Sequence, residues 1–399
     1  MLQSPERSSE ARGLHGGRSR AALEHFRRLC RRGIHGVATE PGHRRRQSGP
    51  LSDVPAEGAG GAGARAARPR GRREATRDRR GRLVTRPVLT YSGPAEAAEV
   101  VREVAGTRFE IRTVPPEADA VASGLKSASA FLDASMKVRL TEAMIAAAPE
   151  LRLVVTATTG ADHIDADALA RRGIPLLTLK GQREVLSDLT PAAEHSWLLL
   201  MACARRLPSA HNHVLAGGWN RTDFPGMMLK GKSIGIIGCG RLGRWMARYG
   251  AAFGMRCRGY DPYLEAWPAG IERVELAELL AISDFISLHV HLTPDNAGLL
   301  GRAEFAQMKR GCVFVNTSRG ELIDEAALLD GLESGRIGAA GLDVLTGEPD
   351  VAEHPLRRYA LARDNLVITP HIAGYSPDAV RVVVRFSAGR IVDFFGATR

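Results

Sequence analysis

The sequence predicts an α/β protein with two Rossmann-like, doubly wound parallel-sheet domains, the first of them discontinuous and flavodoxin-like, preceded by a disordered arginine-rich tail. Three observations predict this fold. Strand and helix signals alternate from about Arg86 onward. A strand, a glycine-rich turn and a helix follow one another around Gly238. The composition also changes sharply near residue 83. The 399 residues exceed what one core serves, since a domain takes about 100–200 residues.

The tail, residues 1–83, is rich in Arg, Gly, Ala, Ser and Pro and poor in large apolar residues. Such a segment buries too little surface to offset its ordering entropy, so we expect it to be disordered. Residues 1–86 hold 21 Arg, no Lys and 8 acidic residues, a net +13, which leaves about −2 for residues 87–399. The charge of the folded part therefore does not argue for nucleic acid or a membrane as a partner. The tail itself is compatible with a functionless or mis-assigned upstream stretch, a nucleic-acid tether or a transit peptide.

The first domain is expected to begin with a short β-like run at Arg86–Tyr91 (RPVLTY). Ser129–Ser135 (SAFLDAS) and Leu151–Thr159 (LRLVVTATT) predict two further strands, and Leu140–Pro149 (LTEAMIAAAP) predicts a helix between them. Strands and helices that alternate at this spacing form βαβ units, and such units build a parallel sheet.

The second domain begins at Thr190–Pro191, a plausible N-cap and first helical residue, which opens an apolar helix ending at Arg205–Arg206. After it five strand signals, SIGIIG, CRGYD, DFISLHV, CVFVNTS and AGLDVL, alternate with helical stretches, as expected for a six-strand doubly wound pattern. A last helix, Pro377–Phe395, is expected to return to the first domain. The predicted bounds are 84–189 completed by 372–399 for the first domain and 190–371 for the second.

Five cysteines are scattered without a CxxC or CxxxH spacing, which argues against a zinc site and against a dense disulfide framework. No apolar run approaches the roughly 20 residues that span a bilayer, and no secretory signal is recognisable. We therefore expect a soluble, cytoplasmic protein in a reducing compartment, with no metal.

A dinucleotide-binding turn is predicted at Gly238-Cys-Gly240-Arg-Leu-Gly243, directly after an apolar strand and at the start of a helix. The first glycine permits the tight turn, the second lets the backbone approach a pyrophosphate, and the third lets helix and strand pack closely. The backbone of Arg241 and Leu242 at the helix N-terminus should hold the phosphate.

Asp261 ends the next strand, 18 residues beyond Gly243. A carboxylate there accepts hydrogen bonds from the ribose hydroxyls and repels a 2′-phosphate, so NAD is the predicted cofactor. Arg256 and Arg258 leave tolerance of NADP open.

Three later segments read VNTSRGELIDE (Val315–Glu325), GLDVLTGEP (Gly341–Pro349) and TPHIAG (Thr369–Gly374). Together with the glycine motif they resemble the D-isomer-specific 2-hydroxyacid dehydrogenase family over roughly residues 88–395. The resemblance implies a short form without a C-terminal regulatory domain, and a homodimer built around the cofactor domain.

The resemblance assigns catalysis to Arg319, Glu348 and His371. Reduction of a 2-keto acid adds a hydride to C2 while the oxygen takes a proton, which an imidazolium such as that of His371 supplies. Glu348 is the expected carboxylate partner of this ring, and Arg319 offers a planar guanidinium to the substrate carboxylate. The backbone N–H groups of Thr159 and Gly160 are expected to hold the same carboxylate.

Further contacts follow from the resemblance alone. Asp343 is expected to meet the nicotinamide amide, and Thr317, Ser318 and Gly374 to line the cofactor. The loop 289–294 should pass under the nicotinamide ribose, and the loop 133–137 should face the substrate. Lys137 has two interpretations, contact with a second anionic group or simple solvation. The remaining histidines are expected to be structural: His163, His195, His211, His213 and His354.

The predicted function is hydride transfer between NAD(H) and C2 of a small 2-hydroxy or 2-keto acid. The sequence does not identify the acid, and the segment Leu179–Pro191, longer than is usual in the family, is either a wall of the site or a surface turn. An alternative function is a cofactor-sensing, corepressor-like protein whose basic tail binds nucleic acid.

Overall fold

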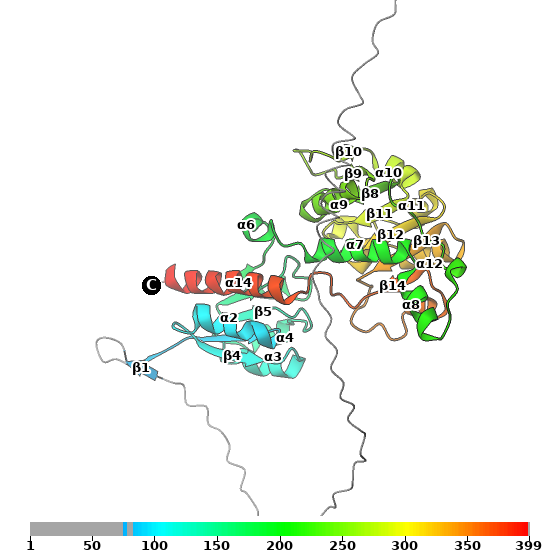
Figure 1. Ribbon diagram of the computed structural model, residues 1–399. Helices are drawn as coiled ribbons and strands as arrows, with labels where there is room; N and C mark the ends of the chain where they lie inside the picture. Colours follow the sequence, from blue (N-terminus) through cyan, green and yellow to red (C-terminus); the bar gives the residue numbers. More distant parts are fainter. Residues whose placement is uncertain (1–74, 78–82, 398–399) are drawn as a thin grey trace, which may run out of the picture. The chain divides into compact units, whose positions relative to one another are not determined.

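The computed structural model describes residues 75–77 and 83–397, which fall within one compact unit, Gly71–Arg399. Its first strands, β1 (Ala75–Arg77) and β2 (Leu83–Thr85), pair in antiparallel register (Figure 1). The sequence pattern did not predict this pair. The remainder of the predicted disordered tail lies outside the described residues.

The first sheet has five parallel strands: β3 (Val88–Ser92), β4 (Glu110–Val114), β5 (Ala130–Asp133), β6 (Leu153–Thr156) and β7 (Leu176–Leu177). Their order is β4-β3-β5-β6-β7. Numbered from the first strand this order is 2-1-3-4-5, that of flavodoxin-like folds, and it confirms the predicted class of the domain.

Helices cover both faces of the first sheet: α2 (Ala95–Ala105), α3 (Ala118–Leu125), α4 (Glu142–Ala146), α5 (Ala166–Arg171) and α14 (Pro377–Ala397). The apolar sides of α2 and α14 share one core with Leu89 and Leu132. Those of α3, α4 and α5 share the other with Phe131 and Val154. Helix α14 lies along α2 (Figure 1), so the end of the chain completes the first domain, as predicted.

The second sheet has seven parallel strands: β8 (Ser233–Ile237), β9 (Arg256–Tyr260), β10 (Glu272–Arg273), β11 (Phe285–Leu288), β12 (Cys312–Asn316), β13 (Ile337–Leu342) and β14 (Leu366–Ile368). Their order is β10-β9-β8-β11-β12-β13-β14, which extends the 3-2-1-4-5-6 order of dinucleotide-binding sheets by one strand. Six strands were predicted. The short edge strand β10 has two exposed residues and no apolar signal.

The second sheet is also covered on both faces. Helices α7 (Pro191–Ala204) and α9 (Arg241–Ala252) share a core with Ile234 and Val313. The other face packs against α10 (Leu276–Ile282), α11 (Arg302–Gln307), α12 (Glu325–Glu333) and α13 (Pro355–Ala362). The remaining elements are α6 (Arg183–Leu186), α8 (Leu207–Leu215) and the short 3-10 helices η1 (Arg221–Asp223), η2 (Pro294–Asn296) and η3 (Gly320–Leu322).

Candidate active site

The predicted site residues follow the carboxyl ends of four strands of the second sheet. The glycine turn follows β8, Arg319 follows β12, Asp343 follows β13 and His371 follows β14. In an open parallel sheet these ends form one edge, where ligands of doubly wound folds bind. The site is therefore built from loops that a common scaffold holds.

The glycine turn has the geometry that the motif predicts. Gly238 has φ +90°, and a Cβ there would lie 2.4 Å from the carbonyl oxygen of His289. A Cβ at Gly243 would lie 2.2 Å from the Gly238 oxygen, so helix α9 can approach the turn only without one. At Gly240 a Cβ would meet nothing within 4 Å. The turn thus leaves open space at the N-terminus of α9, which fits an approaching pyrophosphate.

Arg241 and Asp261 flank this turn. The Arg241 guanidinium donates to the carbonyl oxygen of Leu189, and burial lowers its pKa. The segment Leu179–Pro191, for which a wall of the site and a surface turn were the two alternatives, therefore touches the glycine turn through Leu189. Asp261 accepts hydrogen bonds from the backbone N–H of Cys239 and of Tyr263, each at 3.0 Å. Since a carboxylate has about four acceptor positions, Asp261 keeps acceptor capacity for ribose hydroxyls.

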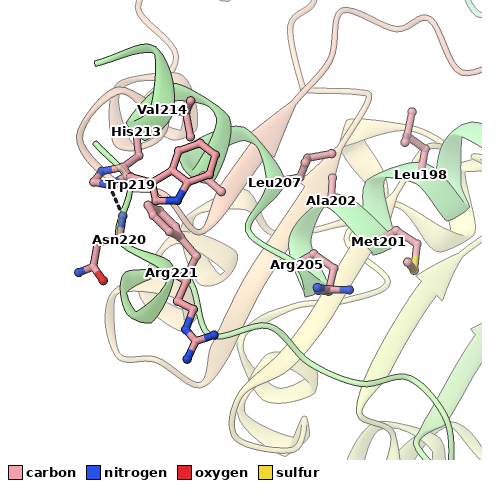
Figure 2. A pocket seen from close by; sticks show the side chains of 12 residues that line it. Leu198, Met201, Ala202, Arg205, Leu207, His213, Val214, Trp219, Asn220 and Arg221 are labelled. Atoms are coloured by element: carbon pink, nitrogen blue, oxygen red, sulfur yellow. Dashed lines mark hydrogen bonds between the residues drawn. The ribbon is translucent and has the colours of Figure 1, made fainter. Parts of the chain in front are cut away.

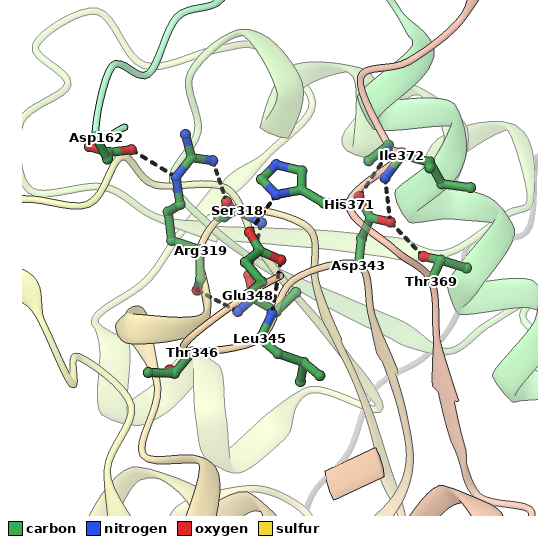
Figure 3. A network of polar contacts seen from close by, with 12 residues as sticks. Asp162, Ser318, Arg319, Asp343, Leu345, Thr346, Glu348, Thr369, His371 and Ile372 are labelled. Atoms are coloured by element: carbon green, nitrogen blue, oxygen red, sulfur yellow. Dashed lines mark hydrogen bonds and ion pairs between the residues drawn. The ribbon is translucent and has the colours of Figure 1, made fainter. Parts of the chain in front are cut away.

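His371 and Glu348 form an ion pair, with 2.5 Å between Nδ1 and Oε1. Both side chains are about one-third exposed, at 32% and 31%. The backbone N–H of His371 donates to the carbonyl oxygen of Asp343 at 2.8 Å. Because the Glu348 carboxylate contacts Nδ1, Nε2 is the ring nitrogen that has no hydrogen-bond partner among the described residues. Figure 3 shows this pair in a polar network that also contains Arg319.

The loop that carries Glu348 is anchored by Glu325, to which the sequence motifs assigned no role. Glu325, at the start of α12, accepts from the backbone N–H of Thr346 at 2.9 Å and pairs with Nε2 of His354 at 3.0 Å. A Cβ at Gly320 would lie 2.3 Å from the Thr346 nitrogen. The residue after Arg319 therefore packs directly on the loop of Glu348, which couples the positions of the two functional side chains.

Asp343 is fully buried and organises the loop of His371. Its carboxylate accepts from the Thr369 hydroxyl at 2.6 Å and from the backbone N–H groups of Ile372 and Ala373 at 2.9 and 2.7 Å. Burial alone would raise its pKa, but these bonds and the nearby His195 lower it. His195 Nε2 lies 2.9 Å from Thr369 Oγ1 and 3.5 Å from Asp343. Sequence reasoning treated His195 as an ordinary structural histidine; its contact with Thr369 spans 174 residues and leaves no local signal.

Thr317 and Ser318 line the same edge. The Thr317 hydroxyl lies 2.7 Å from that of Ser196 in α7, and the Ser318 hydroxyl donates to the Leu288 carbonyl at 2.8 Å. Gly374 is exposed, and a Cβ there would meet nothing within 4 Å. The contacts of these three residues with a cofactor stay a prediction.

Thr159 and Gly160 lie in the loop after β6. The Thr158 hydroxyl donates to the Gly160 carbonyl at 2.7 Å, which fixes the turn. Within the described residues, neither Thr159 nor Gly160 has an acceptor for its backbone N–H. Asp162 in the same loop accepts from Nε of Arg319 at 3.0 Å. The structure thus brings the two predicted carboxylate-binding groups, the loop and Arg319, together.

The loop after β5, in the first domain, is held by a buried pair. Asp133 accepts from Nε2 of His163 at 2.9 Å and from the backbone N–H groups of Ser135 and Met136. That His163 is structural stays a prediction. Lys137, which ends this loop, is exposed.

The pKa of His291 is lowered, mainly by burial and in addition by the nearby Lys180, Arg319 and Arg241, while Asp162 acts in the opposite direction. Among the residues described, no group of three or more His, Cys, Asp or Glu side chains is placed to hold a metal ion. No helix in this part of the chain has the length and apolarity needed to cross a membrane.

Comparisons with known proteins agree with the family resemblance of the sequence motifs. The family model of the D-isomer specific 2-hydroxyacid dehydrogenase, NAD binding domain matches residues 197–373. D-3-phosphoglycerate dehydrogenase of Mycobacterium bovis is 38% identical over 278 residues, 69% of this chain and 51% of that protein. Hydroxypyruvate reductase of Thermotoga maritima is 38% identical over 245 residues, 61% of this chain and 78% of that protein.

A solved structure has the same fold. The crystal structure of D-lactate dehydrogenase from Aquifex aeolicus, complexed with NAD and lactic acid, superposes with a TM-score of 0.66 at 27% identity, covering 78% of this chain and 96% of that one. The chain spans about half the length of the D-3-phosphoglycerate dehydrogenases that it matches, 51% for the Mycobacterium bovis protein.

Proposed function

Because the chain belongs to the D-isomer-specific 2-hydroxyacid dehydrogenase family and contains its NAD-binding domain, we propose that it transfers a hydride between NAD(H) and C2 of a small 2-hydroxy or 2-keto acid. The observation that carries this proposal is the ion pair of His371 with Glu348, set beside Arg319 at the carboxyl edge of the second sheet. An acid, its carboxylate partner and a carboxylate-binding guanidinium are the groups that this reaction requires.

His371 acts as the general acid in the reductive direction. When the hydride reaches C2, the C=O electron pair moves onto the oxygen, and Nε2 of His371 gives that oxygen its proton. Glu348 holds Nδ1, so it orients the ring and stabilises the imidazolium before transfer. In oxidation the neutral ring takes the hydroxyl proton, and the same atoms act in reverse.

Arg319 fixes the substrate. Its guanidinium and the backbone N–H groups of Thr159 and Gly160 bind the carboxylate beside the reacting carbon. A substrate held at both its carboxylate and its oxygen has its C2 oriented, and orientation of this kind lowers the barrier without new chemistry.

The cofactor is held by the strand–turn–helix unit. The nicotinamide supplies or accepts the hydride. Gly238, Gly240 and Gly243 shape the pyrophosphate turn, the backbone of Arg241 and Leu242 binds the phosphates, and Asp261 takes the ribose hydroxyls and so favours NAD over NADP. Thr317, Ser318 and Gly374 line the nicotinamide end, and the buried Asp343, whose oxygens are hydrogen-bonded to Thr369, Ile372 and Ala373, supports it by holding the loop of His371.

Two copies of the chain are proposed to form a homodimer through the second domain. Support comes from an apolar hollow of about 640 Å³ between α7, α8 and the segment before β8 (Figure 2). Its lining includes Leu207, Val214 and Trp219, and Trp219 is 89% exposed. Contiguous apolar side chains in contact with water are typical of a surface that another protein covers.

A cytoplasmic location is proposed as well. It is supported by four cysteines of the described part that are free and buried: Cys203, Cys239, Cys257 and Cys312. The alternative function, a cofactor-sensing protein tethered to nucleic acid, depends on the tail, which lies almost wholly outside the described residues. No observation on the rest of the chain favours it.

The test is NADH oxidation by the purified full chain against a panel of 2-keto acids, with NADPH in parallel and with the variant His371→Asn. Asn tolerates the positive φ of +53° at this position, but it cannot donate a catalytic proton. We expect turnover of at least one keto acid with NADH and a fall of about 10²–10⁴ in kcat for the variant, with NADH affinity unchanged. Absence of turnover with every keto acid of the panel, or full activity of the variant, would overturn the proposal.

A further inference from the structure

Arg319 already holds a carboxylate that belongs to the protein. Its Nε donates to Asp162 Oδ2 at 3.0 Å, and its Nη1 donates to the Ser318 carbonyl at 2.7 Å. Figure 3 shows Asp162 reaching the guanidinium from the loop after β6. The charge that is proposed to bind a substrate carboxylate is therefore neutralised in the substrate-free chain.

The loop of Asp162 also approaches Arg319 with its backbone. A Cβ at Gly160 would lie 2.2 Å from Nη2 of Arg319, so a side chain there would push the guanidinium out of its present position. The same loop carries the N–H groups of Thr159 and Gly160, which have no acceptor among the described residues. One short loop thus brings a glycine backbone and a carboxylate to a single guanidinium.

The two partners differ in their freedom to move. The Arg319 side chain is 22% exposed and keeps a second bond to Ser318, whereas the Asp162 side chain is 56% exposed. Within the described residues, Arg319 is the one hydrogen-bond partner of the Asp162 carboxylate. Asp162 can therefore turn into water at small cost while the guanidinium stays in place.

We propose that the Asp162 carboxylate competes with the substrate carboxylate for Arg319. When the substrate binds, its carboxylate either displaces Asp162 from the guanidinium or binds beside it. This inference rests on the proposed role of Arg319 in substrate binding. In either case the negative charge of Asp162 opposes an incoming anion. Asp162 thereby sets the affinity of the site for 2-keto acids and takes no part in proton or hydride transfer.

The consequence is a separation of KM from kcat. The competing carboxylate weakens binding of the ground state and of the transition state equally, because the substrate carboxylate is present in both. An effect that is equal in both states changes KM and leaves kcat constant. Partly exposed ion pairs are weak. We therefore expect Asp162→Asn to lower KM by about three- to tenfold, and Asp162→Ala to lower it at least as much.

The experiment compares the wild type with these two variants and with Asp167→Asn. Asp167 is an exposed carboxylate in the first turn of α5, so its variant removes the same charge from the same segment without touching Arg319. KM and kcat are measured with the keto acid that the panel identifies. The dissociation constant of oxamate, a 2-keto acid analogue that is not reduced, is measured by calorimetry on the NADH complex.

Tighter oxamate binding and a lower KM in both Asp162 variants, with wild-type values for Asp167→Asn, support the inference. A KM that rises in Asp162→Ala would instead make Asp162 a residue that positions Arg319, and an unchanged KM and oxamate affinity would show that the pair has no role in binding. Either result overturns the inference while leaving the proposed function intact, because that function is tested separately by turnover and by His371→Asn.

Discussion

His371, His289 and His195 all lie near the carboxyl ends of strands of the second sheet, yet their ring atoms have different partners. His371 is paired at Nδ1 and keeps Nε2 for a substrate. His289 is largely buried, with Nε2 2.7 Å from the Ser287 hydroxyl and a buried Nδ1 that has no partner among the described residues. His195 meets Thr369. Burial and bonding thus separate a candidate acid from two structural rings.

His289 gives a prediction about stability and pH. Burial lowers its pKa from 6.5 to about 4, so between these values the unfolded chain binds a proton that the folded chain does not. The stability that the neutral ring contributes is therefore complete above about pH 6.5 and is lost as the pH falls toward 4. We expect His289→Gln to reduce the slope of unfolding free energy against pH in this window, by up to about 1.4 kcal/mol per pH unit.

Urea unfolding of the wild type and of His289→Gln at several pH values between 4 and 7 measures this slope. The difference between the two slopes cancels the contributions of other groups. Parallel curves would mean that His289 ionises in the folded protein, contrary to its burial.

Candidate residues could be identified from the sequence where each belongs to a short, recognisable sequence motif. This holds for the glycine turn, Asp261, Arg319, Glu348 and His371. Asp162 and Glu325 could not be assigned in this way, because their partners lie 157 and 21 residues away. Nothing in a linear pattern tells which exposed-looking carboxylate will meet a given guanidinium.

At the scale of elements, the unit formed by β8, the glycine turn and α9 divides its tasks among glycines. Gly238 and Gly243 permit close approach within the protein, as the contacts that a Cβ would make demonstrate. Gly240, with φ −70° and open space around it, is under no such internal demand. Its small size is therefore explained by what approaches from outside.

Two alanine variants separate these roles. Gly238→Ala forces a side chain into a left-handed conformation and against the His289 carbonyl, so we expect unfolding free energy to fall by about 2–4 kcal/mol. Gly240→Ala keeps stability within about 0.5 kcal/mol but weakens NADH binding by about tenfold or more, since its methyl group occupies the space open to the pyrophosphate.

Denaturant unfolding without nucleotide and fluorescence titration with NADH distinguish the two effects. Equal destabilisation by both variants would show that the space at Gly240 is needed for folding. Tight NADH binding by Gly240→Ala would show that the cofactor does not approach there.

Helices and strands of ordinary length were predictable because burial on one or both faces leaves an apolar period in the sequence. The predicted closing helix, Pro377–Phe395, differs from α14 (Pro377–Ala397) by two residues at one end. The elements β10 and α6, of two and four residues, lack the buried apolar run that marks strands of similar length such as β5 and β6. They are fixed by neighbouring strands and helices.

At the scale of the molecule, the chain passes from the first domain into α7 and returns through α14. Both connections between the domains contribute to the candidate site. Ser196 of α7 contacts Thr317, and His371 precedes α14 by a few residues. Sequence order alone indicated this discontinuous arrangement, because one helix remained after the last strand of the second sheet.

The apolar hollow beside α7 and α8 carries the last prediction. A symmetric dimer places the same patch of each copy against the other, so a charge introduced there is buried in duplicate. Trp219 and Leu207 line the hollow and are 89% and 55% exposed. If this patch is the interface, the double variant Leu207→Glu/Trp219→Glu must desolvate four carboxylates, which a complex does not tolerate.

Light scattering coupled to gel filtration should find the wild type as a dimer at micromolar concentration and the double variant as a monomer. Leu361→Glu is the matched control, since Leu361 is 74% exposed on α13 and does not line the hollow. A monomeric wild type would leave the apolar surface without its proposed partner. A double variant that remains dimeric would move the interface elsewhere. Loss of the dimer together with a lower, concentration-independent melting temperature would show that association also stabilises each subunit, because binding to the folded state alone shifts unfolding by mass action.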